Sequence, residues 1–318
     1  MSESDLIAEP DEGGDRLADT QGPVPSGEPP RRLASAGRRG SAHDAATHQW
    51  VVRTANSDKV PTTTRLRNAW PLLRMYAVRQ VRLRYTQSAL GLAWTVVQPV
   101  ALMSIYGFIF TAFFDVNGDG RPYLAVAWTG LTVWMFIQAG VQAGTVALRN
   151  DAWLLGRVWF PREIIPLAPV LASLIDLAAA GAILLGVIAV QGVGFGVQSF
   201  AVVVPLVVLV LWVAAISVIT ATITVFFRDM ATIVALGLRL AFIASPIMYP
   251  GSAVPDEYKW VNAANPFAVI IENFRATLLA HHWPNLGLLA FHGAVAAVLL
   301  TAGMWYLRSV ERRMVDVI

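Results

Sequence analysis

The chain has 318 residues, of which 56% are hydrophobic and 14% are charged, and its formal net charge is +3. This composition is too apolar for an ordinary soluble protein, so the length does not translate into a number of soluble domains. The chain has no cysteine, which excludes disulfides, thiolate metal ligands and a cysteine nucleophile.

The first 60 residues differ in composition from the rest of the chain. They are rich in Gly, Pro, Ser, Asp and Arg and contain few large apolar side chains. A segment of this kind cannot bury enough apolar surface to fold, so residues 1–60 are expected to form a disordered cytoplasmic tail. The tail either binds a regulatory partner or is a solvated extension, and its composition favours the extension.

Residues 65–84 predict a basic amphipathic helix next to the first apolar stretch. Apolar positions at helical spacing are Leu66, Trp70, Leu73, Ala77 and Val81, whereas Arg67, Arg74 and Arg82 lie on another face. Such a helix lies in the headgroup plane, with its apolar face in lipid and its arginines toward anionic lipid. Alternatively, the arginines only set the topology, although that role does not require an apolar stripe.

The rest of the chain contains six apolar stretches long enough to cross a bilayer. A helix rises about 1.5 Å per residue, so roughly 20 residues cover a hydrocarbon core of about 30 Å. The stretches lack the strict alternation of membrane barrel strands. They are residues 85–114, 122–148, 164–190, 200–227, 231–249 and 284–307. The expected fold class is therefore an all-α integral membrane protein, with six transmembrane helices within residues 85–318.

The positions of Lys and Arg predict the orientation of these spans, because cytoplasmic flanks retain positive charge. Thirteen of the 24 precede Tyr85, and with six spans another seven fall on the same side. The opposite side holds only Arg121, Lys259 and Arg275. Both termini of this multi-pass protein are therefore predicted on the cytoplasmic side of the cytoplasmic membrane. Because the arginines flank spans and form no basic face, no nucleic-acid partner is expected.

Two charged residues fall inside predicted spans, Asp176 in the third and Arg239 in the fifth. An ionisable group in hydrocarbon costs at least a few kcal/mol unless it meets water or a partner. Counted from the cytoplasmic ends of their spans, the two residues lie about 18 and 12 Å deep. Three hypotheses follow: the two pair across the spans, Arg239 faces a hydrated path, or Arg239 extends to the cytoplasmic headgroups.

Motifs for catalysis and cofactor binding are missing from the sequence. Its two lysines, Lys59 and Lys259, do not follow a GxxxxG run, so the chain has no P-loop for ATP. The HExxH, GxSxG and DxD motifs are also absent, and the five histidines form no metal-ligand pattern. We therefore expect no catalytic residue, no metal and no cofactor in this chain, which favours transport over enzymatic activity.

Five segments of the chain follow one another in an order found in a known family. They are RQVRLRYTQSALGLAWTVVQPV (79–100), LLGRVWFPREIIP (154–166), FFRDM (226–230), SPIMYP (245–250) and NPFAVIIENFR (265–275). On these segments the chain resembles the permease subunit of ABC-type polysaccharide and polyol-phosphate exporters, which move lipid-linked O-antigen, teichoic acid and galactan polymers. The resemblance covers residues 65–318 and leaves only the tail outside it.

The resemblance implies a half-transporter, in which two copies of this chain assemble with two copies of a separate ATPase subunit that binds ATP and Mg. From its residues alone, the aromatic and charged loop 150–166 docks either on the membrane surface or into a partner. The resemblance implies the second, as a coupling helix seated in the ATPase. The coupling residues would be Leu154, Arg157, Trp159, Phe160, Arg228 and Asp229. Alternatively, Arg228 and Asp229 form an ordinary turn in which Asp229 caps the next helix.

The resemblance also implies two gates. The helix over residues 65–84 would be a gate helix along the inner leaflet, where a lipid-linked substrate enters. Residues 251–282 would form a pair of short re-entrant helices that dip into the outer leaflet as an extracellular gate. The gate-helix residues would be Trp70, Arg74, Arg82 and Arg84, and the outer-gate residues would be Asn265, Pro266, Phe274 and Arg275.

A polymer exporter needs a groove that holds sugar rings weakly, and aromatic faces provide such contacts by stacking. The candidates for a channel lining are Trp94, Tyr106, Phe108 and Phe110 in span one and Phe242, Met248 and Tyr249 in span five. For any one of them, a position facing lipid or at headgroup level is the alternative.

The expected function is the permease subunit of an ATP-driven exporter that moves a lipid-linked cell-surface polysaccharide outward during cell-wall biogenesis. The excess of Arg over Lys and the many Ala, Val and Gly residues suggest a high-GC genome, for which a galactan precursor is the first candidate cargo. The alternatives are an ABC exporter of a drug or lipid, a secondary transporter or channel, and a membrane glycosyltransferase. Few intramembrane charge pairs and no recognisable acidic site argue against the last two.

Overall fold

The computed structural model describes residues 62–86, 122–152, 161–311 and 313–314, together with isolated residues between 97 and 109. The tail of residues 1–60, the loop 153–160 and almost all of the first predicted span therefore lie outside the described residues. The chain divides into two units, Met1–Val51 and Val52–Ile318, and every described residue belongs to the second.

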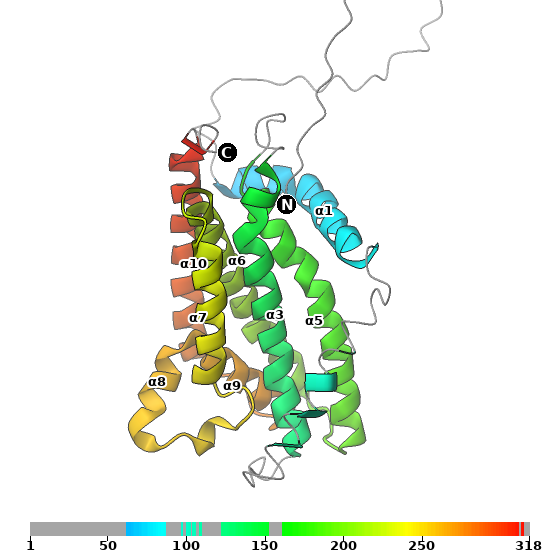
Figure 1. Cartoon of the computed structure of the whole chain (residues 1–318). Helices are drawn as coiled ribbons and strands as arrows, with labels where there is room; N and C mark the ends of the chain where they lie inside the picture. Colours follow the sequence, from blue (N-terminus) through cyan, green and yellow to red (C-terminus); the bar gives the residue numbers. More distant parts are fainter. Residues whose placement is uncertain are drawn as a thin grey trace, which may run out of the picture. The chain divides into compact units, whose positions relative to one another are not determined.

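Helices make up most of the part of the chain that the structure describes (Figure 1). The longer helices are α1 (Thr62–Thr86), α3 (Tyr123–Asn150), α5 (Ile164–Val190), α6 (Val203–Phe226), α7 (Met230–Ala244), α9 (Pro266–Leu278) and α10 (Leu286–Ser309). Shorter elements are α8 (Lys259–Ala264) and the 3-10 turns η3 (Val197–Val202), η4 (Gly251–Ala253) and η5 (Asp256–Tyr258).

Four of the described helices are long and apolar enough to cross a membrane: α3, α5, α6 together with η3, and α10. Helix α7 is apolar but has only 15 residues. The sequence predicts a longer span over 231–249, but the helix ends at Ala244, because a proline at 246 disfavours helical geometry at Ser245, which is extended. The integral membrane class is thus supported by four spans, and the total of six stays a prediction.

Helix α3 occupies the centre of the bundle, where it contacts α5, α6, α7 and α9. It approaches α6 closely at two glycines one turn apart, Gly140 and Gly144. A Cβ atom added at these positions would lie 2.6 Å from Val213 and 2.5 Å from Ser217. The Ser217 hydroxyl donates to the Gly140 carbonyl at 3.2 Å, as expected where small residues let membrane helices touch.

The helix predicted over residues 65–84 is present as α1, and it packs against α5. Leu73, Tyr76 and Ala77 are buried against Ile164 and Ala168. Trp70, expected on the same apolar stripe, is 54% exposed. The helix is therefore rotated relative to the predicted stripe, because its contact with α5 selects the face that carries Leu73 and Ala77.

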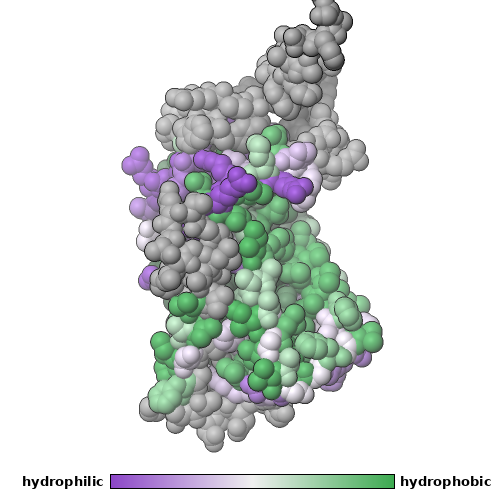
Figure 2. All heavy atoms as spheres, turned by 90° about the vertical axis from the view of Figure 1, so that its right-hand side faces the viewer, coloured by the Kyte–Doolittle hydropathy of each residue, from purple (hydrophilic) through white to green (hydrophobic). Residues whose placement is uncertain are grey.

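The surface of the bundle is divided between apolar and hydrophilic regions. Viewed from the side of α1 and α5, hydrophobic residues cover the flank, and hydrophilic residues gather near the end that carries α1 (Figure 2). Helix α9 lies at the end opposite α1 (Figure 1). This distribution agrees with a bundle whose flank faces lipid and whose ends face water.

We predict that Gly144→Val destabilises the protein through the α3–α6 contact. Overpacking a close helix contact costs about 1–3 kcal/mol, because the helices have to separate. Thermal unfolding in detergent measures the effect, with Gly181→Val on α5 as the control, since nothing lies within 4 Å of an added Cβ there. Equal unfolding temperatures for the two variants would contradict the role of Gly144.

Candidate functional site

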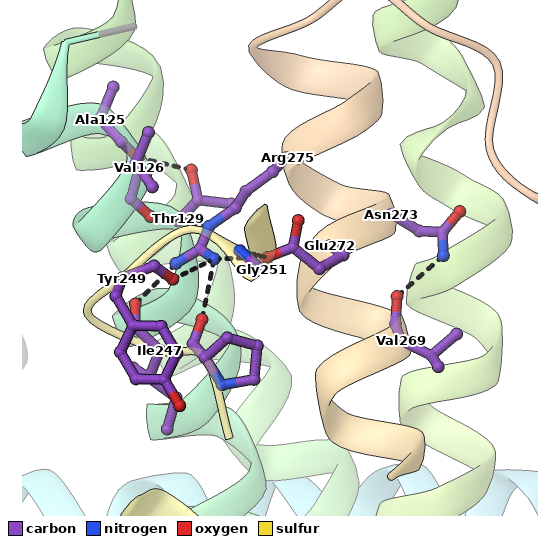
Figure 3. Close-up of polar contacts among 11 residues, drawn as sticks. Ala125, Val126, Thr129, Ile247, Tyr249, Gly251, Val269, Glu272, Asn273 and Arg275 are labelled. Carbon is purple, nitrogen blue, oxygen red and sulfur yellow. Dashed lines mark hydrogen bonds and ion pairs between the residues drawn. The ribbon is translucent and has the colours of Figure 1, made fainter. Parts of the chain in front are cut away.

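Two sequence segments that carry the resemblance, SPIMYP and NPFAVIIENFR, meet in the structure around Arg275. This arginine lies on α9 and is only 1% exposed. Its guanidinium donates hydrogen bonds to four backbone carbonyls and to one carboxylate (Figure 3). The distances are 3.1 Å to Val126, 2.8 Å to Pro246, 2.7 Å to Ile247, 2.9 Å to Tyr249 and 2.7 Å to the Glu272 carboxylate.

The carbonyls of residues 246–249 need these donors because the chain is not helical there. Buried backbone carbonyls without partners are costly, and a guanidinium offers five N–H groups in a fixed fork. Glu272 balances the charge, and its carboxylate also accepts from the Gly251 amide at 3.0 Å. The three segments, α3, the turn after α7, and α9, are thereby joined at one point. We call this cluster the Arg275 brace.

A glycine on α3 makes room for the Arg275 brace. A Cβ atom at Gly130 would lie 2.2 Å from the Ile247 carbonyl oxygen and 2.9 Å from the Arg275 guanidinium. The turn therefore sits directly on the α3 backbone at this residue.

The other expected outer-gate residues lie near the same turn. Asn265 accepts from the amides of Phe267 and Ala268 as the N-cap of α9, and its side-chain amide donates to the Ser245 hydroxyl at 2.9 Å. Pro266 is the first residue of α9, and Phe274 is buried. The structure thus brings the four residues onto one helix that covers the end of α3. Insertion of this helix into the outer leaflet and a role as a gate stay predictions.

We predict that Arg275→Lys destabilises the outer end of the bundle, because an ammonium cannot replace a fork that reaches four carbonyls. Leaving a buried charged network incomplete costs about 3–5 kcal/mol. The unfolding temperature in detergent should fall accordingly, whereas Arg149→Lys, at an exposed site near the end of α3, should leave it unchanged. A similar response of both variants would argue against the brace.

At the other end of the bundle, ion pairs hold both ends of the segment that contains the expected coupling helix. Before it, Asp151 accepts from Arg79 of α1 at 3.3 Å and from Gln80 at 3.5 Å. After it, Glu163 accepts from Arg308 of α10 at 2.5 Å. Arg162 also contacts Glu311, through its carboxylate at 3.0 Å and its carbonyl at 2.6 Å. The predicted topology places this end in the cytoplasm, so we call these contacts the cytoplasmic frame.

The expected coupling residues themselves divide into two groups. Leu154, Arg157, Trp159 and Phe160 lie outside the described residues. Arg228 and Asp229 are exposed in the turn between α6 and α7. Asp229 stands at the N-cap position of α7, but its side chain makes no capping hydrogen bond. The simple capping explanation for this aspartate is therefore wrong, and both side chains are accessible from the cytoplasmic side of the predicted topology.

Tyr76 lies on α1, next to the Arg79 and Asp151 side chains of the cytoplasmic frame. Burial raises the pKa of its hydroxyl, and the neighbouring Asp151 carboxylate raises it further. Its ring also lies beneath the Arg79 guanidinium, 5.2 Å from the ring centre, in cation–π geometry. The tyrosine thus stays neutral and helps to place Arg79 beside Asp151.

Asp176 pairs with a different arginine from the one hypothesised. Its carboxylate forms an ion pair with Arg84 at the end of α1. Arg239 is exposed on α7. The proposed pair of Asp176 with Arg239 is therefore replaced by a link from α5 to α1, which lies directly against α5.

A charge swap distinguishes the two pairings. Asp176→Arg should lower the free energy of unfolding by about 1–3 kcal/mol, because it places two positive charges beside each other. This value lies between those for exposed and for buried ion pairs. Adding Arg84→Asp should restore most of the loss in thermal unfolding, whereas adding Arg239→Asp should not. Rescue by the second combination alone would reverse this assignment.

The remaining predicted gate and lining residues are partly described. Trp70, Arg74 and Arg82 are exposed on α1 and line a hollow of about 660 Å³. Phe108 is 66% exposed. Trp94, Tyr106 and Phe110 lie outside the described residues.

The lining residues of span five differ from the expectation. Met248 is 4% exposed in the core. Phe242 packs edge-on against Trp134 of α3, with ring centres 5.6 Å apart. Tyr249 is half-buried, and its carbonyl belongs to the Arg275 brace. A channel lining in this conformation therefore does not include Met248, because its side chain is enclosed by this chain's own helices.

Sequence reasoning missed the partners that hold these residues in place. Asp151, Glu163 and Arg308 were visible only as charges near span ends, and counting charges for topology does not pair them. The burial of Arg275 was missed for the same reason. The signal that could have found it is the position of the arginine in a mostly apolar helical stretch, three residues after Glu272 and ten after a helix cap at Asn265.

Known proteins match the region of the chain that contains α1 to α9. A family model described as ABC-2 type transporter matches residues 71–279, from α1 to the end of α9. The chain is 31% identical over 237 residues to the O-antigen export system permease protein RfbA of Myxococcus xanthus, covering 73% of this chain and 89% of that protein. It is 26% identical over 232 residues to a protein of the same name from Klebsiella pneumoniae, covering 72% and 88%. The matched region includes the Arg275 brace and the Asp151 and Glu163 sides of the cytoplasmic frame.

Proposed function

Because this chain belongs to the ABC-2 type transporter family, we propose that it is the permease subunit of an ATP-driven exporter that moves a lipid-linked cell-surface polysaccharide outward. The observation that carries the proposal is the similarity to O-antigen export permeases over nearly three quarters of this chain. The family expected from the five sequence segments is confirmed. In the proposed assembly, two copies of this chain bind two ATPase subunits, which bind ATP and Mg.

The cytoplasmic frame supports a coupling role for the segment between Asp151 and Glu163. One end of this segment is tied to α1 and the other to α10, while α3 and α5 continue from it directly. A displacement of the segment by an ATPase would therefore act on four helices at once. A partner drives a conformational change only through contacts that differ between states, and partly exposed ion pairs are contacts that can change.

The exposed face of α1 supports an entry site for the lipid-linked cargo. Its hollow combines the guanidinium groups of Arg74 and Arg82 with the indole ring of Trp70. Guanidinium groups suit phosphate, and an aromatic face suits a sugar ring. A diphosphate-linked saccharide at the inner leaflet presents both chemistries. The galactan precursor remains our candidate cargo on the ground of composition.

The test of the proposed function is co-purification with the ATPase encoded beside the gene. Wild type should form a stable complex whose ATP hydrolysis is coupled to export. Trp159→Ala combined with Phe160→Ala should reduce assembly or coupled export at least tenfold, because aromatic anchors dominate docking surfaces. The control is Tyr258→Ala combined with Trp260→Ala, which removes two exposed aromatics near the opposite end of the bundle.

The outcomes separate the classes of transporter. Loss of assembly or coupling in the first variant and not in the control supports the permease and its docking loop. If no ATPase co-purifies with wild type and the chain alone transports or conducts, a secondary transporter or channel takes its place.

A further inference from the structure

Helix α7 presents an exposed face with an arginine at its centre. Its apolar side chains Ile233, Leu236, Leu240 and Ile243 are between 56% and 73% exposed. Arg239 follows Leu236 by three residues and precedes Ile243 by four, so the three share this face. Arg239 is also exposed, and it is the one charged residue of α7.

The described residues offer this arginine no counter-ion. Among the residues that the structure describes, none forms a hydrogen bond or ion pair with Arg239. Asp176 is the one acidic residue within the six predicted spans, and its carboxylate contacts Arg84. The first span, which lies mostly outside the described residues, has no charged residue between 85 and 114.

The position of Arg239 makes an unmatched charge costly. It follows the first residue of α7 by nine residues, or about 13 Å at the helical rise. A charge at such depth costs a few kcal/mol or more unless water or an anion accompanies it. Arginines within membrane spans therefore mark hydrated paths or ligand sites more often than lipid contacts.

A second copy of the chain does not by itself supply a counter-charge for Arg239. In a twofold dimer a residue at the centre of the contact meets its own equivalent. Two Arg239 side chains would then repel each other unless an anion lay between them. The described part of the chain, alone or as a twofold pair, therefore leaves this charge to a ligand from outside.

We propose that Arg239 binds a phosphate group, either of the diphosphate that joins the polymer to its lipid carrier or of a membrane phospholipid headgroup. A guanidinium binds phosphate oxygens with two parallel hydrogen bonds. The apolar side chains around it match the hydrocarbon chain that follows such a phosphate. The first source rests on the proposed function, whereas the second does not.

Binding of short-chain probes tests the proposal. The permease–ATPase complex in detergent is titrated calorimetrically with farnesyl diphosphate, and with farnesol as the uncharged probe. Arg239→Gln should weaken farnesyl diphosphate binding at least tenfold and leave farnesol unchanged, and Arg239→Lys should retain part of the affinity. Leu236→Gln is the matched control, because it adds the same amide to the same face without removing a charge. In a second arm, native mass spectrometry counts bound phosphatidylglycerol.

The outcomes assign the phosphate or overturn the proposal. Weaker farnesyl diphosphate binding identifies the carrier diphosphate, and loss of phosphatidylglycerol alone identifies a headgroup. If Arg239→Gln has the unfolding temperature of wild type, still assembles with the ATPase and changes neither ligand, the proposal is wrong while the proposed function stands. If wild type binds no ATPase, the proposed function is wrong, and both arms are run on the permease alone.

Discussion

The end of the bundle that the predicted topology places outside depends on one buried cation, Arg275. Directly after α7, residues 245–250 leave helical geometry, so their carbonyls need donors from elsewhere in the fold. Arg275 supplies those donors to residues 246–249 and to α3, and Glu272 balances its charge. The positions of η4, α8 and α9 follow from this arrangement, because each is attached to the turn that Arg275 holds.

The two ends of the bundle are built from different interactions. At the outer end, a fully buried guanidinium bonds mainly to backbone, which fixes one geometry. At the other end, partly exposed ion pairs join Arg79 of α1 to Asp151, Arg308 of α10 to Glu163, and Arg162 to Glu311. Exposed pairs are individually weak and can be exchanged for others, whereas a buried network has few alternatives. The two ends thus differ in how readily their contacts could be exchanged.

The apolar lengths in the sequence predicted the long helices closely, since 164–190 coincides with α5 and 122–148 differs from α3 by two residues at most at either end. The partners of charged residues were less predictable. The hypothesised pairing of Asp176 considered only other spans, whereas the arginine that reaches it belongs to the amphipathic helix. The aromatic lining failed at Met248 because composition does not determine how the segment after α7 turns. Rotation about a helix axis and long-range contacts require tertiary structure.

The Arg275 brace also has a consequence for biosynthesis. Its backbone acceptors are residues 126, 246, 247 and 249, and the donor is synthesised after all of them. The carbonyls of the turn after α7 therefore have no guanidinium donor until α9 has been synthesised. This end of the bundle can therefore be completed only after α9 has been made, which places its completion late in the assembly of the chain.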